Sequence, residues 1–156
     1  MKPFNFSLES LRTLRKQKER AAQQHYAHTL AACETAGAEL RRAEADLTTG
    51  WNLLNHELQH GITAGRLAGF QTWCKALETR RNERKAFLDE AQHAVQLALQ
   101  LLNHAARERE ALDRFHDKSH RLHTRAVQRE EQKIFDELAV QLNGTPGPLN
   151  FNTHKN

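Results

Sequence analysis

The sequence contains little proline, few aromatic residues and few hydrophobic residues, and each shortage narrows the possible folds. Proline occurs only at positions 3, 146 and 148, so none breaks a helix in the long middle of the chain. Hydrophobic residues make up 38% of the 156 residues and aromatic residues 6%. That content is too low for a thick globular core, but it suffices for the narrow seam of a coiled coil, in which roughly two positions in seven are buried. The remaining composition, rich in Ala, Leu, Glu, Gln, Arg, Lys and His, favours a single all-α domain built of long helices.

Long apolar runs are also missing. No stretch approaches the ~20 apolar residues that a helix needs to cross a membrane, and Met1 to Phe6 lacks the apolar run of a secretory signal. We therefore expect a cytosolic protein with no membrane insertion. The two cysteines, Cys33 and Cys74, fit a reducing compartment and are expected to stay unpaired.

Signatures of catalysis and of cofactor binding are absent from the sequence as well. It has no Gly-rich phosphate loop, no nucleophile elbow and no Cys/His pair with a third orienting residue. Ten histidines invite a metal hypothesis, and His56/His60 and His116/His120 have the i,i+4 spacing that places two imidazoles on one helical face. Neither pair has a third ligand at a convincing spacing, so we interpret them as solvated or seam-edge histidines. The sequence predicts no enzyme, no cofactor and no metal site.

Three glycines within nine residues, Gly61, Gly65 and Gly69, mark the point around which the chain is organised. Each costs a helix interior roughly 1 kcal/mol relative to alanine, and together they favour a turn that folds one helix back on another. The sequence therefore predicts an antiparallel coiled-coil hairpin in residues 1–142: a helix over about 7–60, a turn over about 61–65 and a helix over about 66–142. With the turn centred near residue 63, opposed residues have numbers that sum to about 126, which separates the two cysteines by roughly 28 Å. Residues 143–156 are predicted to form a disordered tail.

Apolar residues recur at steps of three and four along both predicted helices. In the first helix the predicted seam runs from Phe4 to Leu58 and includes Trp51. Its extra four-residue steps, at 36 to 40 and 47 to 51, are interpreted as stutters that would locally unwind a supercoil. A competing stripe leaves the register open in the middle of this helix; it contains Leu14, Tyr26, Leu30, Cys33 and Gly37.

The second helix is predicted to be longer and to overhang the first. By the sum rule Leu8 lies opposite about residue 118, so about two dozen residues, from about 119 to 142, have little or no partner from this chain. An apolar stripe in this segment needs another surface; it contains Leu122, Ala126, Ile134 and Leu138. We expect a monomeric hairpin roughly 110 Å long, because the nearest partner for each seam is the chain's own other helix.

The formal net charge is +4, and cations gather in two runs without intervening acids. Both runs fall at the open end of the predicted hairpin; they are Arg12, Arg15, Lys16 and Lys18, and Lys118, Arg121, Arg125 and Arg129. Three interpretations stay open: charges that merely solvate the helices, a site for an acidic protein partner, and a site for nucleic acid. Nucleic acid ranks behind the protein partner, because the basic segments have no recognisable binding module and no interleaved aromatics for base stacking.

Three segments, in chain order, carry a family likeness: FNFSLESLRTLRKQKERAA near the start, GITAGRLAGFQTWCKALE at the hinge and return helix, and EEQKIFDELA late in the chain. They resemble the FliJ family, stalk proteins of flagellar type III export that are related to YscO-type proteins of virulence secretion. The resemblance implies a two-stranded antiparallel coiled coil, similar to the central stalk of rotary ATP synthases, that sits in the pore of a hexameric export ATPase. It implies three partners: that ATPase ring, the cytoplasmic domain of the membrane-embedded export gate, and the export chaperones that the stalk helps to recycle. The implied location is cytoplasmic, peripheral at the cytoplasmic face of the inner membrane.

The resemblance also leads to candidate contact residues. The family's gate-binding surface includes the start of the return helix, where Trp73 and Leu77 occupy the matching apolar positions on one face, and Arg80 and Arg84 continue that face. We place the ATPase contact at the open end, where apolar residues border the basic runs; its residues are Phe4, Leu8, Leu11, Arg12, Arg15, Phe115, Arg121, Leu122 and Arg125. The function predicted first is a non-enzymatic coupling rod of type III export. Its rivals are a generic structural coiled-coil oligomer and a basic, nucleic-acid-associated helical protein.

Overall fold

The computed structural model describes residues 3–143, and those residues form two α-helices and no strand. Helix α1 spans Glu9–His60 and has 52 residues, and helix α2 spans Ala64–Asn143 and has 80 residues. The expected all-α fold of two long helices, the second longer than the first, is confirmed. The tail predicted over 143–156 lies outside the described residues, except for Asn143, which ends α2.

The turn between the helices is short and depends on one glycine. Gly61 has a positive φ of 86°, a left-handed conformation that follows helix ends and that side chains with a Cβ rarely adopt. Thr63 then starts α2, because its carbonyl oxygen accepts the Leu67 N–H at 2.9 Å and its hydroxyl accepts the Arg66 N–H at 3.4 Å. Gly65 and Gly69, which the sequence associated with the turn, both lie inside α2.

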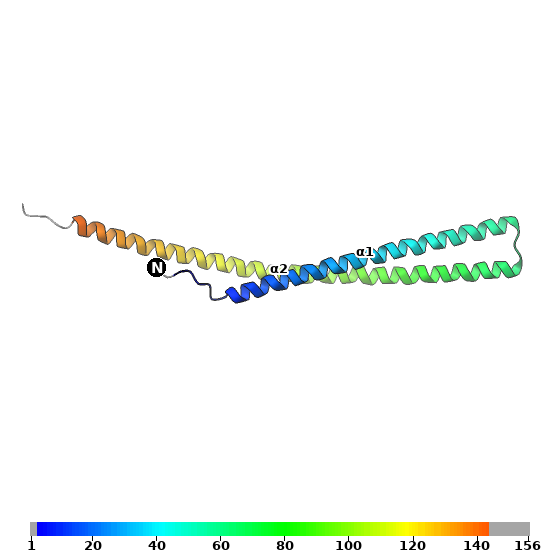
Figure 1. Cartoon of the computed structure of the whole chain (residues 1–156), viewed down its shortest axis with the longest axis horizontal. Coiled ribbons are helices and arrows are strands. Elements are labelled where there is room, and N and C mark those ends of the chain that lie inside the picture. The colour runs from blue at the N-terminus through cyan, green and yellow to red at the C-terminus, as the bar shows by residue number, and fades with distance from the viewer. Residues whose placement is uncertain (1–2, 144–156) are drawn as a thin grey trace, which may run out of the picture. The chain divides into compact units, whose positions relative to one another are not determined.

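The chain divides into two units, and the larger, Leu11–Glu110, contains the hairpin. Figure 1 shows α1 and the first part of α2 running antiparallel from the turn. Ion pairs join the helices along this unit; among them are Arg66–Glu57 at 2.9 Å, Arg80–Asp46 at 3.8 Å, Arg84–Glu39 at 2.7 Å, and the pairs Arg109–Glu19 and Arg15–Glu108. The two residue numbers of each pair add up to between 123 and 128, so the predicted register of about 126 is confirmed.

The seam of α1 is a continuous heptad repeat, and the predicted stutters are wrong. Less exposed positions follow one another at alternating steps of three and four; they are Ala22, Tyr26, Thr29, Cys33, Ala36, Leu40, Ala43, Leu47, Gly50 and Leu54. Trp51 and Leu58, which were expected in the seam, are exposed. The observed seam therefore combines the predicted seam with the competing stripe, since Tyr26 and Cys33 come from the competing stripe.

Gly50 occupies the seam position that was predicted for its large neighbour Trp51. A Cβ placed on Gly50 would lie 2.8 Å from Leu77 Cδ1, 3.6 Å from Trp73 Cζ3 and 3.7 Å from Cys74 Sγ. The helices therefore approach so closely here that the side chains of α2 fill the space of the missing one. Small residues line the seam elsewhere too, with Ala36, Ala43 and Ala98 almost fully buried. Close helix contact, rather than bulky interdigitation, fixes the register.

The second unit combines the start of the chain with the later part of α2, from Ala111 onward. Its core is aromatic. Phe6 is only 7% exposed, and its ring centroid lies 4.9 Å from that of His116 and 5.8 Å from that of Phe115. The Phe4 ring contacts His116, His120 and His123 at centroid distances of 5.6, 5.0 and 5.5 Å. Three histidines at helical spacing therefore hold the nonhelical residues before α1 against α2.

The close approach at Gly50 generates a stability prediction. Gly50→Leu inserts a side chain where Leu77, Trp73 and Cys74 already lie, and overpacking of this kind typically costs about 1 to 3 kcal/mol. Gly69→Leu makes the same change in α2, where, apart from its chain neighbours and the adjacent helix backbone, nothing lies within 4 Å of the new Cβ. We expect chemical denaturation followed by circular dichroism to show a lower free energy of unfolding for Gly50→Leu. The Gly69→Leu protein should be as stable as the parent or up to about 1 kcal/mol more stable. Equal stability of the two variants would contradict the packing described here.

Candidate functional site

The first predicted contact surface lies near the turn, on α2. Trp73 is 41% exposed and Leu77 is half-buried, and both lie against Gly50 of α1. One part of the Trp73 side chain therefore packs on Gly50, and the rest is exposed and can contact a partner. Leu77 contributes mainly to the seam.

A shallow hollow opens beside Trp73. It has a volume of about 360 Å³ and is lined by Arg66, Gly69, Phe70 and Trp73. The Phe70 and Trp73 rings form two of its walls, with centroids 6.1 Å apart and planes inclined at 59°. Gly69 leaves its floor open, because no other part of the protein, beyond the chain neighbours and the adjacent helix backbone, comes within 4 Å of the position that a Cβ would take. The hollow can accept an apolar side chain of a partner between two aromatic rings.

The cations near this hollow already take part in ion pairs of the hairpin. Arg66 pairs with Glu57, Arg80 with Asp46, and Arg84 with Glu39. The face that continues from Trp73 and Leu77 toward residue 84 therefore carries arginines that are engaged in cross-helix ion pairs. Its apolar part is confined to the neighbourhood of Trp73.

The second predicted surface is distributed over both units of the chain. Leu11, Arg12 and Arg15 belong to the hairpin unit, where Arg15 pairs with Glu108 across the seam. The other members belong to the second unit; they are Phe4, Leu8, Phe115, Arg121, Leu122 and Arg125. Within the second unit, Phe4 packs on histidines and Phe115 contacts Phe6, so both rings contribute to the aromatic core as well as to the surface.

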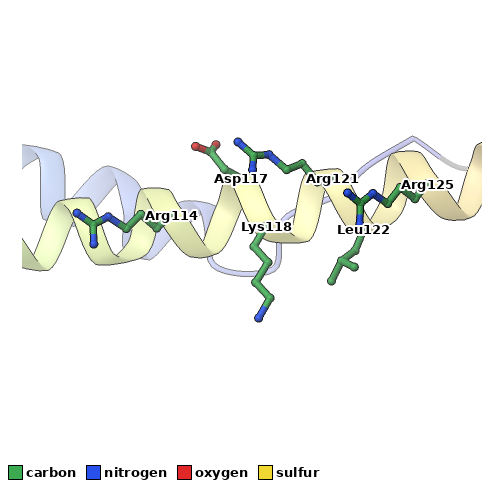
Figure 2. Close-up of a pocket in the computed structure, with 6 residues that line it drawn as sticks. All are labelled: Arg114, Asp117, Lys118, Arg121, Leu122 and Arg125. Atoms are coloured by element: carbon green, nitrogen blue, oxygen red, sulfur yellow. The ribbon is translucent and has the colours of Figure 1, made fainter.

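Arg121, Leu122 and Arg125 do come together, in a hollow of about 410 Å³ on α2. Figure 2 shows its six lining residues, which also include Arg114, Asp117 and Lys118. Four cations thus surround one carboxylate and the side chain of Leu122, which is 57% exposed. This arrangement can attract an anionic group and offer it one apolar contact.

The described residues contain no group of three or more His, Cys, Asp or Glu side chains placed to hold a metal ion. His56 and His60, which looked like half a metal site, have ring centroids 4.2 Å apart, and Nδ1 of His60 lies 2.8 Å from the His56 carbonyl oxygen. Within residues 3–143 no helix is long and apolar enough to span a membrane.

Sequence reasoning missed two groups of residues near the predicted surfaces. Phe70 and Gly69 complete the hollow beside Trp73, and their signal was the glycine repeat at four-residue spacing that ends at a tryptophan. Of the histidines that contact Phe4, His116 and His120 were interpreted as solvated or seam-edge residues and His123 was not considered, although their spacing of four and three also matches a surface for aromatic packing.

Comparisons with known proteins point in one direction. The model of the family described as Flagellar FliJ protein matches residues 4–146, which is nearly the whole chain. The searches of curated proteins and of solved structures gave no match.

The mixed environment of Trp73 generates a second stability prediction. Leu54 is 4% exposed, so Leu54→Ala should lower the free energy of unfolding by about 2 to 5 kcal/mol. Trp73→Ala should cost less than Leu54→Ala, because much of the indole is already in water. Parallel thermal and urea melts of the two variants measure this order. A Trp73→Ala protein as unstable as Leu54→Ala would make Trp73 a core residue.

Proposed function

We propose a function that starts from family membership: the chain belongs to the flagellar FliJ protein family, whose model matches residues 4–146. Membership associates it with flagellar assembly and protein export. The chain acts there as a non-enzymatic stalk that couples a hexameric export ATPase ring to the cytoplasmic domain of the export gate. It also assists the recycling of export chaperones, and it works in the cytoplasm, peripheral at the inner membrane.

The observation that carries this proposal is the family match, and the hairpin is physically suited to the role. A coupling element has to keep its two helices in one register under load. The heptad of α1 runs without a break, and ion pairs recur along the hairpin from Glu57–Arg66 to Arg15–Glu108. Slippage by one heptad would separate these pairs and move Leu77 and Trp73 away from Gly50, whose missing side chain leaves room for them, so the register resists shear.

The ATPase contact is assigned to the surface that contains Leu122, Arg121 and Arg125. Cations around an exposed leucine suit a contact in which charge speeds the encounter and apolar burial holds the complex. The gate contact is assigned to Trp73 and Leu77. In support, Trp73 forms a wall of the hollow beside the turn, and partly exposed tryptophans are frequent anchors of protein interfaces.

The first experiment concerns the ATPase. Arg121→Glu with Arg125→Glu should slow association with the cognate export ATPase by about tenfold or more at low salt, with a smaller effect at high salt. Stopped-flow or surface-plasmon measurements of the association rate test this. Arg41→Glu with Arg42→Glu is the matched control, since both arginines are exposed and the charge change is the same. Equal slowing by the control would show a nonspecific effect of net charge, and unchanged rates for the Arg121/Arg125 variant would contradict the assignment.

The second experiment concerns the gate. Trp73→Ala should lose most binding to the cognate gate cytoplasmic domain in a calorimetric titration, because truncation of an anchor residue commonly costs 2 kcal/mol or more, roughly 30-fold in affinity. Trp51→Ala is the control: it removes a similarly exposed tryptophan from α1 and should leave binding intact. Retained binding by a folded Trp73→Ala protein would leave this hollow without a role in export.

The rival of a generic coiled-coil oligomer has one supporting observation. Ile134, Phe135 and Leu138 are exposed in the late part of α2. Association of the chain with itself in the absence of export proteins, with no binding to the ATPase or the gate, would favour that rival over a stalk.

A further inference from the structure

The later part of α2 carries a second stripe, on the face turned away from the seam. From Phe115 to Val140, residues at steps of three or four are exposed at every position. In contrast, His116, His123, Val127 and Glu131, which continue the seam, are all less exposed. We name the exposed stripe the basic outer face; its cations are Lys118, Arg125, Arg129 and Lys133, and its apolar members are Phe115, Leu122 and Val140.

The stripe of the basic outer face is mainly cationic. It has four cations and one carboxylate, Asp136, which accepts a hydrogen bond from Gln132 Nε2 at 3.0 Å. Two further carboxylates flank the stripe, Asp117 beside Lys118 and Leu122, and Glu137 beside Val140. Its apolar side chains are far from covered, since Leu122 is 57% exposed and Val140 is 71% exposed. A helix face that mixes cations with exposed apolar side chains is typical of segments that lie on an anionic membrane surface or that bind an acidic partner.

We propose that the basic outer face binds the surface of an anionic lipid bilayer. The spacing of its apolar residues favours a bilayer over a groove in a protein. A helix that fills a protein groove presents anchors at i, i+3, i+4 and i+7, whereas no two of Phe115, Leu122 and Val140 lie closer than seven residues. The face extends over 26 residues, or roughly 39 Å of helix, so its cations can reach many headgroups while each apolar side chain inserts separately.

The number of cations on the basic outer face is sufficient for binding to anionic lipid. Four to eight cations on one helix face are the usual requirement for recognition of anionic lipid, and the face has four. Both free phosphate and lipid headgroups would pair with the cations. Of these two, only lipids in a bilayer would also bury the apolar side chains. The inference gives a physical basis for the peripheral membrane location within the proposed function, and it rests on that function for its biological meaning. Phe115, Leu122 and Arg125 belong to both this face and the proposed ATPase contact. Binding to lipid nevertheless needs no export protein, so the two proposals can fail separately.

The test uses the full chain and vesicles that contain either phosphatidylcholine alone or phosphatidylcholine with 30% phosphatidylglycerol. Co-sedimentation should show binding to the anionic vesicles only, and the binding should weaken as salt rises. Arg129→Gln with Lys133→Gln should reduce the partition coefficient by roughly fivefold per cation, or roughly 30-fold together. Neither residue belongs to the proposed ATPase contact. Arg41→Gln with Arg42→Gln, on α1, has the same net charge and should bind like the parent.

A spectroscopic arm detects insertion. In a background with Trp51→Phe and Trp73→Phe, Leu122→Trp should show a blue-shifted emission on anionic vesicles and no shift with soluble glycerophosphate at the same phosphate concentration. Equal binding to neutral vesicles, equal loss in the Arg41/Arg42 control, or an unshifted emission would overturn the proposal. It would also be overturned if the chain ignored anionic vesicles while Arg129→Gln with Lys133→Gln weakened binding to the export ATPase, because the face would then contact protein.

Discussion

The hairpin depends on how closely its two helices approach each other. At Gly50 the side chains of α2 take up the space that a Cβ would need, and the small seam residues Ala36 and Ala43 are almost fully buried. Buried area is modest in a two-helix structure, so the register cannot depend on bulk alone. It depends on the few positions where no larger residue fits and on ion pairs at the seam's edges. Both constraints specify the same pairing, in which residue numbers add up to about 126.

The hairpin could be predicted from the sequence because its strongest signals are local. Proline is missing from the middle of the chain, glycines cluster at one place, and the seam repeats over dozens of residues. The detailed seam of α1 could not be predicted, because a search for apolar periodicity prefers Trp51 to its neighbour Gly50. A glycine becomes the better seam residue only when the opposite helix supplies Leu77 and Trp73 to fill its space. That information belongs to the pair of helices and is absent from either one alone.

The candidate surfaces show the same division. Trp73 could be found from a family resemblance, and its exposure agrees with a surface role, but the neighbouring wall and floor of the hollow, Phe70 and Gly69, became visible only in three dimensions. The basic runs were visible in the sequence, yet their cations have different environments. Arg15 is engaged across the seam with Glu108, whereas Arg121 and Arg125 border a hollow on α2. Counting charges could not separate cations that hold the hairpin together from cations available to a partner.

The unbroken heptad of α1 has a mechanical consequence. A repeat of 3.5 residues, kept without stutters, winds two helices into a left-handed supercoil along Leu11–Glu110. A left-handed supercoil does not respond equally to torque in its two directions. Torque in one direction tightens the winding and presses the seam together, and torque in the other direction loosens it. Stutters would have provided places where the winding could relax. Without them in this unit, a twist applied at the Gly61 end is carried along the seam with a built-in preference for one direction of rotation.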